Sequence, residues 1–364
     1  MDAPVRRAHR LPSSLLLAAA LLVGCSSTTA SSKGRGPEPS SGDGAGSLPL
    51  PADCEEPRGV FGVAEALADE GHPCHAWVRA CAGRVLQSGN MSAALWTTQT
   101  AAGTGLFVSA IHTLGEGWIA PGGQAAPRLL RSPSETEGTM RLTPTTPSGQ
   151  LKPVVAPMFL MFHPAVPAAE TGNKLRDITP RHDFYVAAID GQRVVTNDTH
   201  LGVLPQPLTA TPPAVFDPKG HLAEPHADAS PGDRVLMVGV PMQGPTAGRP
   251  TASVGLVLDE AGVSAAMAEL RGDGDEEGNL AHDPEVEHIV RGSAIAGMSG
   301  GGVFDAQGRL VGVLVRASTE TKPPGYVRFV RLTTIARALD EAVTAADERT
   351  RTAIAPYLPA WPVE

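Results

Sequence analysis

The segment Gly297-Met298-Ser299-Gly300-Gly301 contains the residue types that nucleophilic catalysis requires. A serine between glycines can be presented on an exposed turn, and the glycines allow backbone N–H groups to converge on an oxyanion. A serine hydroxyl is a poor nucleophile near neutral pH, so a base must lie within hydrogen-bond reach. Because the chain contains 40 glycines among 364 residues, this motif alone is equally compatible with an ordinary loop.

The histidine positions decide which serine enzyme the chain could form. In the nucleophile elbow of α/β-hydrolases the histidine follows the serine. No histidine occurs after His288, and a strand–turn–strand pattern follows Ser299, so this interpretation is set aside. Upstream, His112 comes just after Gly105-Leu106-Phe107-Val108-Ser109, and Asp183 directly precedes the apolar run 184–189. Taken singly, His112 could be a surface histidine and Asp183 a turn residue.

Together these three segments, in the order His, Asp, Ser, resemble the chymotrypsin-like serine proteases, especially their bacterial trypsin-like and HtrA-type branch. The resemblance covers about residues 92–340. It implies an all-β fold of two antiparallel six-stranded β-barrels and hydrolysis of peptide bonds through an acyl-enzyme, without a cofactor. It also implies that Ser299 is the nucleophile, that His112 is the general base and acid, and that Asp183 orients the imidazole. The amides of Gly297 and Ser299 would form the oxyanion hole.

The same resemblance assigns a substrate-binding region before the nucleophile and on the strand after it. No acidic residue stands where it would select Lys or Arg, so we expect a preference for a small or medium apolar side chain. The strand could pair with an extended polypeptide substrate. The assigned residues are Ser293, Ala294, Ile295, Val315, Arg316 and Ala317.

Two departures from the family pattern affect the function. Met298 stands where Asp or Asn is usual, and Gly302 stands where Pro is common. An apolar Met cannot pair with a new N-terminal ammonium, so we expect packing to hold this loop. The departures keep open the alternative of a catalytically inactive protease-fold lipoprotein that acts as a binding module.

Residues 92–345 are predicted to form the protease domain, because short β-rich runs alternate with Pro, Gly and Asp turns and lack intervening amphipathic helices. Helical spacing predicts two short helices in an extension, residues 52–91, and a terminal helix from Leu332 to about Arg349 that enters the C-terminal tail 346–364. The Pro-rich stretches 144–167 and 205–231 are predicted surface loops, and 273–278 a solvated acidic loop. The predicted strands are residues 94–100, 103–109, 140–143, 184–189, 235–240, 253–258, 303–304, 310–315 and 326–332.

Residues 1–24 have the features of a signal peptide, with a positive start and a short apolar run. Leu22-Val23-Gly24-Cys25 resembles the lipobox of bacterial lipoproteins, which implies lipidation of Cys25 and membrane anchoring in the cell envelope, at the periplasmic face of the outer membrane. Residues 25–51, poor in apolar side chains, are predicted to be a disordered tether. In an oxidising compartment we then expect Cys54 to pair with Cys74 or with Cys81, and the sequence leaves this choice open.

Composition limits the partners. The formal net charge is −9 and Lys and Arg form no cluster, which argues against a nucleic-acid partner. The histidines and cysteines lack the spacings of common zinc motifs, so no metal is assigned.

Overall fold

The computed structural model describes residues 52–55, 57–88, 91–97, 105–114, 129–130, 138–142, 154–170, 178–189, 193–194, 206–207, 227–319, 322 and 324–358. These residues belong to one compact unit, Ala45–Glu364. The predicted signal peptide, Cys25 and the tether lie outside the described residues. Among the described helices, none is long and apolar enough to cross a lipid bilayer.

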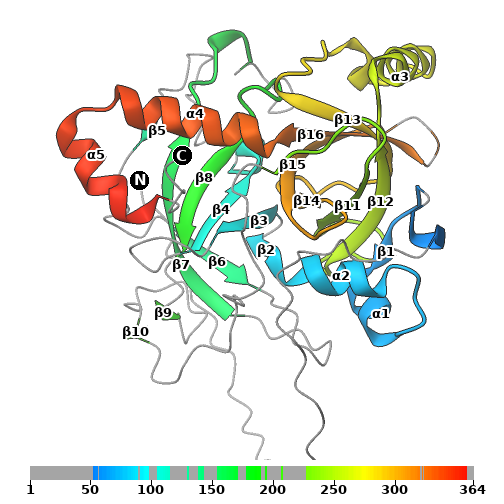
Figure 1. Cartoon of the computed structure of the whole chain (residues 1–364), viewed down its shortest axis with the longest axis horizontal. Coiled ribbons are helices and arrows are strands. Elements are labelled where there is room, and N and C mark those ends of the chain that lie inside the picture. The colour runs from blue at the N-terminus through cyan, green and yellow to red at the C-terminus, as the bar shows by residue number, and fades with distance from the viewer. Residues whose placement is uncertain are drawn as a thin grey trace, which may run out of the picture. The chain divides into compact units, whose positions relative to one another are not determined.

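The C-terminal half of the unit contains a closed antiparallel barrel of six strands (Figure 1). Its strands are rich in Val and Leu and are buried along most of their length, as expected of strands that are covered on both faces. Short β1 (Phe61–Gly62) extends the sheet at β12. In ring order the strands are β12 (Thr251–Val257), β11 (Arg234–Gly239), β14 (Gly302–Phe304), β15 (Leu310–Ala317), β16 (Gly325–Arg331) and β13 (Glu287–Gly292), and β13 pairs again with β12.

A second antiparallel sheet precedes the barrel in sequence. Its strand order is β5–β7–β6–β2–β3–β4–β8, and β7 also pairs with β8. Short β9 (Arg193–Val194) and β10 (Gln206–Pro207) form a separate pair. The bounds of the second sheet's strands are β2 (Val85–Ser88), β3 (Met91–Thr97), β4 (Gly105–Ser109), β5 (Leu129–Leu130), β6 (Gly138–Leu142), β7 (Val154–His163) and β8 (Tyr185–Ile189).

The all-β prediction is confirmed for this barrel and sheet, and each predicted strand overlaps a strand of the structure. The prediction of a surface loop over residues 144–167 is wrong, because the long strand β7 lies within it. Pro157 pairs with Thr139 of β6, while β8 pairs with β7 only from Met158 onward. Proline is therefore placed where a partner strand lies on one side only, a position that tolerates its missing N–H.

Two short helices, α1 (Val63–Ala68) and α2 (His75–Cys81), precede the second sheet in sequence. They pack on the closed barrel. A disulfide joins Cys54 to Cys74, and Cys81 is a free, buried thiol. Trp77 Nε1 donates to Asp305 O at 2.7 Å, and Arg84 donates to Gly308 O at 2.9 Å. The acceptors lie in the turn between β14 and β15, so this extension is attached to the barrel.

The remaining helices flank the sheets. α3 (Glu260–Gly272), which the sequence did not predict, begins after Asp259, whose side chain accepts a hydrogen bond from Gly262 N. α4 (Leu332–Ala345) begins directly after β16, and α5 (Glu348–Ile354) lies within the residues assigned to the tail. One hydrophobic cluster contains side chains of both sheets and of α4, such as Val186, Val330 and Ile335.

Candidate active site

His112 and Asp183 are brought together by the pairing of β4 with β8. The register places Ser109, the last residue of β4, opposite Tyr185, the first residue of β8. His112 follows in a short 3-10 helix, Ile111–Leu114, and Asp183 lies just before β8. Two sequence segments that are 71 residues apart therefore meet at one end of the second sheet.

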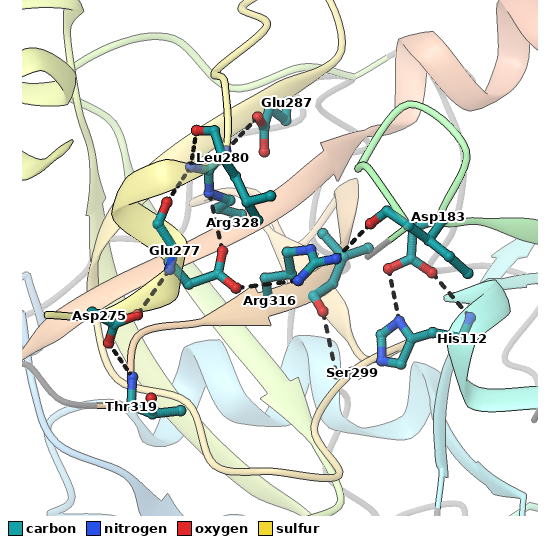
Figure 2. A network of polar contacts seen from close by, with 12 residues as sticks. His112, Asp183, Asp275, Glu277, Leu280, Glu287, Ser299, Arg316, Thr319 and Arg328 are labelled. Carbon is teal, nitrogen blue, oxygen red and sulfur yellow. Dashed lines mark hydrogen bonds and ion pairs between the residues drawn. The ribbon is translucent and has the colours of Figure 1, made fainter. Parts of the chain in front are cut away.

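The pair has two contacts. Asp183 Oδ1 accepts a hydrogen bond from His112 N at 3.0 Å, and Asp183 Oδ2 lies 2.7 Å from His112 Nδ1. The Asp183 side chain is fully buried, whereas the His112 side chain is 23% exposed. A carboxylate at Nδ1 favours the tautomer that carries its proton there, which leaves Nε2 as a hydrogen-bond acceptor. Figure 2 shows the Nε2 edge of the ring turned toward Ser299.

Ser299 lies on a turn that precedes β14 and is fixed to β15. Gly300 N donates to Leu314 O at 2.7 Å, and Leu314 N donates to Gly301 O at 2.9 Å. Met298 is buried in the barrel core, and its Cα lies 2.8 Å from the point where a side chain at Gly239 would begin. Packing therefore holds Met298, the residue before the candidate nucleophile, because its uncharged side chain cannot form an ion pair.

The second sheet also holds this turn, through Ser92 of β3. Ser92 N donates to Ser299 O at 3.2 Å, and Ser92 Oγ donates to Gly297 O at 2.9 Å. Ser109 Oγ in turn donates to Ser92 O at 2.7 Å. The strand that leads to His112 is thus connected through Ser92 to the turn that carries Ser299. Sequence reasoning missed Ser92, because a serine in a strand gives no local signal of a contact 205 residues away.

The Ser299 hydroxyl is half-buried and donates to Val315 O at 3.4 Å. Across the described ranges, it makes no hydrogen bond to His112. Catalytic hydrogen bonds are often long or poorly aligned before substrate binds. The structure therefore brings His112 and Asp183 into direct contact and leaves the Ser299 hydroxyl directed to β15.

The two amides assigned to an oxyanion hole are available. In the part of the chain that the structure describes, neither Gly297 N nor Ser299 N donates a hydrogen bond to the protein. Gly297 has φ +97°, and a Cβ there would lie 2.4 Å from Met242 N. Only glycine fits this position without strain, so the turn requires the glycine that the sequence motif contains.

The residues assigned to substrate binding lie on both sides of Ser299. β14 pairs with β15 only as far as Val313, whereas β16 pairs with β15 as far as Ala317. Among the described residues, residues 315–317 therefore have a paired strand, β16, on one side only. Ser293 is half-buried, and Ser253 Oγ donates to its carbonyl oxygen at 2.5 Å. Ala294 and Ile295 pack against the barrel core.

Arg316 enters a buried ionic network, drawn in Figure 2. Its Nη1 donates to Glu277 Oε1 at 3.2 Å, and Glu277 also lies 3.3 Å from Arg328 Nε. Burial raises the pKa of Glu277, against the opposing effect of the two arginines. Burial likewise raises the pKa of Glu287, a second acidic partner of Arg328, to about 7.

The prediction of a solvated acidic loop at residues 273–278 is wrong only in part: Asp273, Gly274 and Glu276 are exposed, whereas Asp275 and Gly278 are buried. Asp275 is 1% exposed, and its carboxylate accepts hydrogen bonds from Glu277 N and from Thr319 N, at 3.0 and 2.6 Å. Arginines far along the chain neutralise Glu277, which allows this part of the acidic segment to be withdrawn from solvent. His182, next to Asp183, is half-buried and lies 2.9 Å from Glu170 Oε2.

Among the described residues, no group of three or more His, Cys, Asp or Glu side chains is arranged to hold a metal ion. The contacts of the candidate site are hydrogen bonds and ion pairs between protein groups.

Comparison with known proteins agrees with this architecture. Residues 164–313 match the family model described as the trypsin-like peptidase domain, and this segment contains Asp183 and Ser299. No curated protein matches the chain. The matched domain, together with the closed antiparallel barrel and its accompanying second sheet, supports placing this chain with the chymotrypsin-like serine proteases.

Proposed function

We propose that this protein is a serine endopeptidase that uses Ser299, His112 and Asp183 as a catalytic triad. The observation that carries the proposal is the contact of a buried carboxylate with His112 Nδ1, at the junction where Ser92 connects the second sheet to the Ser299 turn. A fully buried aspartate that holds an accessible imidazole is the arrangement that general-base catalysis needs.

In the proposed reaction the Ser299 hydroxyl turns from Val315 O to His112 Nε2, which accepts its proton as Oγ attacks the scissile carbonyl. The amides of Gly297 and Ser299 stabilise the oxyanion of the tetrahedral intermediate. His112 then gives the proton to the leaving amine, and an acyl-enzyme remains on Ser299. Water, deprotonated by His112, hydrolyses this ester and releases the second product.

The finer parts of the proposal concern substrate and fold. An extended polypeptide would pair with residues 315–317 of β15, and a small or medium apolar side chain would enter the region of Ser293, Ala294 and Ile295. The additional pairing of β7 with β8 supports the proposal that the second sheet forms a second six-stranded barrel.

We also propose, from the sequence alone, that lipid on Cys25 anchors the enzyme to the cell envelope, with the outer membrane as the expected site. The test is metabolic labelling with an alkyne-bearing fatty acid. Incorporation into the wild-type protein and its loss in Cys25→Ser would support the anchor, whereas equal incorporation in both proteins would refute it.

A fluorophosphonate probe tests the catalytic proposal, because it reacts covalently with an activated serine. The folded wild-type protein should be labelled, Ser299→Ala should not, and the exposed Ser230→Ala should be labelled like the wild type. Absence of labelling on the folded wild-type protein would favour an inactive binding module. The hydrogen bond from Ser299 to Val315 O is the observation that favours this second candidate.

A further inference from the structure

We propose that Arg316 is a positioning residue that holds the Asp183 loop in place from the other sheet. This proposal rests on the proposed triad. Arg316 was assigned to substrate binding from its position on β15, but its guanidinium points into a buried network in Figure 2. Its Nη2 donates to Ile178 O at 2.5 Å, and Ile178 precedes Asp183 by five residues.

The segment from Ile178 to Asp183 is short and internally bonded. His182 N donates to Thr179 O at 2.9 Å, and Asp183 N donates to Pro180 O at 3.3 Å. Glu170 accepts hydrogen bonds from Thr179 N at 3.0 Å and from Thr179 Oγ1 at 3.1 Å. A displacement at Ile178 would therefore be transmitted through these turns to the carboxylate that contacts His112.

Arg316 is itself held on the barrel side. Its side chain is 8% exposed and that of Glu277 is 14% exposed, so water screens this ion pair little. The planar guanidinium donates to Glu277 through Nη1 and to Ile178 O through Nη2, which fixes the direction of both hydrogen bonds. Arg316 consequently joins the barrel strand beside Ser299 to the loop that carries Asp183.

A second contact between this loop and the barrel region has a different character. Arg181 pairs with Asp283, but the two side chains are 56% and 38% exposed. Exposed ion pairs contribute little to stability, because water screens the two charges. The buried Arg316 contact is therefore the one expected to define the position of the loop.

A positioning role and a substrate contact make different predictions for Arg316→Ala. Loss of a substrate contact would raise KM for a peptide and leave the reaction with a small probe unchanged. Loss of positioning would lower kcat and the rate of fluorophosphonate labelling, because the probe needs the aligned triad but not the β15 edge. A misplacement of about 1 Å at a catalytic group can cost on the order of 100-fold in rate.

The experiment compares wild type, Arg316→Ala, Arg316→Lys and the control Arg309→Ala, which removes an arginine from the β14–β15 turn. The labelling rate should fall about 10- to 100-fold in Arg316→Ala and less in Arg316→Lys, which retains one donor, and should be unchanged in Arg309→Ala. The NMR resonance of the His112 Nδ1 proton should broaden or shift in Arg316→Ala alone among the alanine variants.

Unchanged labelling and an unchanged Nδ1 resonance in Arg316→Ala would overturn the positioning role, as would a rise in KM alone. If Arg316→Ala does not fold, Arg316→Lys provides the test. A labelling rate and an Nδ1 resonance equal to those of wild type in Arg316→Lys would refute the requirement that one guanidinium contact both Glu277 and Ile178 O. If wild type itself is not labelled, the proposed protease function fails, while the Nδ1 resonance still decides whether Arg316 positions the His112–Asp183 pair.

Discussion

Replacing Asp183 by Asn tests the triad with a minimal change of shape. Asp183 accepts from two neighbours, the backbone N of His112 at 3.0 Å and the ring atom Nδ1 at 2.7 Å. In the Asn variant the single carboxamide oxygen should accept from the backbone N–H of His112. The opposite orientation would place the carboxamide NH2 against that N–H, and both groups are donors. The carboxamide NH2 then faces Nδ1 and favours the tautomer that carries its proton on Nε2.

That tautomer cannot accept the proton of Ser299, since the required nitrogen is already protonated. In triads of this kind the wrong tautomer lowers kcat about 10⁴-fold, which corresponds to about 5.5 kcal/mol of transition-state stabilisation. We expect a loss of this size in fluorophosphonate labelling of Asp183→Asn, with little change in the folded structure.

The assay is the pseudo-first-order labelling rate at neutral pH, together with thermal unfolding to show that the variant is folded. Asp233→Asn is the matched control, because Asp233 is exposed and caps a local turn through Ser230 N. A labelling rate for folded Asp183→Asn within a few-fold of wild type would refute the assignment of Asp183 to the triad.

Three further predictions concern buried residues, one in the Ser299 turn and two away from the candidate active site. Gly300→Ala should destabilise the fold by about 3 kcal/mol or more, because φ is +83° and the added Cβ would lie 2.0 Å from Ser92 O; an unchanged urea midpoint would contradict this packing. Burial raises the pKa of the Cys81 thiol, so iodoacetamide should modify Cys81 only after denaturation, as read by peptide mass spectrometry; modification of the native protein would be the contrary result. Burial raises the pKa of Glu287 from 4.5 to about 7, so the folded state retains a proton that the unfolded chain releases. This contribution to stability is fully present below pH 4.5 and is lost as the pH rises through about 7. Glu287→Gln should therefore show a smaller loss of stability over that range than wild type in denaturation at several pH values, and equal losses would reject the idea.

The local sequence was sufficient for much of the β structure. Strands such as β11, β15 and β16 are short apolar runs between turn residues, so their positions could be predicted. β7 could not, because its flanking prolines favour a loop and only its pairing with β6 and β8 makes it a strand. α3 was missed because its buried residues, among them Val263 and Leu270, form a narrow stripe between glycines.

The candidate site shows the same division between local and long-range information. His112, Asp183 and Ser299 each carry a local signature, and the structure places the first two in contact. The hydrogen bond from Ser92 to the Ser299 turn and the burial of Asp275 depend on partners that are distant in sequence. Local sequence patterns do not reveal such partners. The disulfide choice was open for the same reason, and the fold decides it in favour of Cys54 and Cys74.

The packing of Trp77 and Arg84 beneath the β14–β15 turn has a practical consequence for protein engineering. The hairpin that they support begins two residues after Gly300, so a truncated protein that starts at β3 would lose both supports, and with them β2, which pairs with β3 and β6. Loss of a buried tryptophan typically costs about 3–5 kcal/mol. Expression plasmids for crystallisation should therefore retain the chain from upstream of Cys54 and place any affinity tag before it.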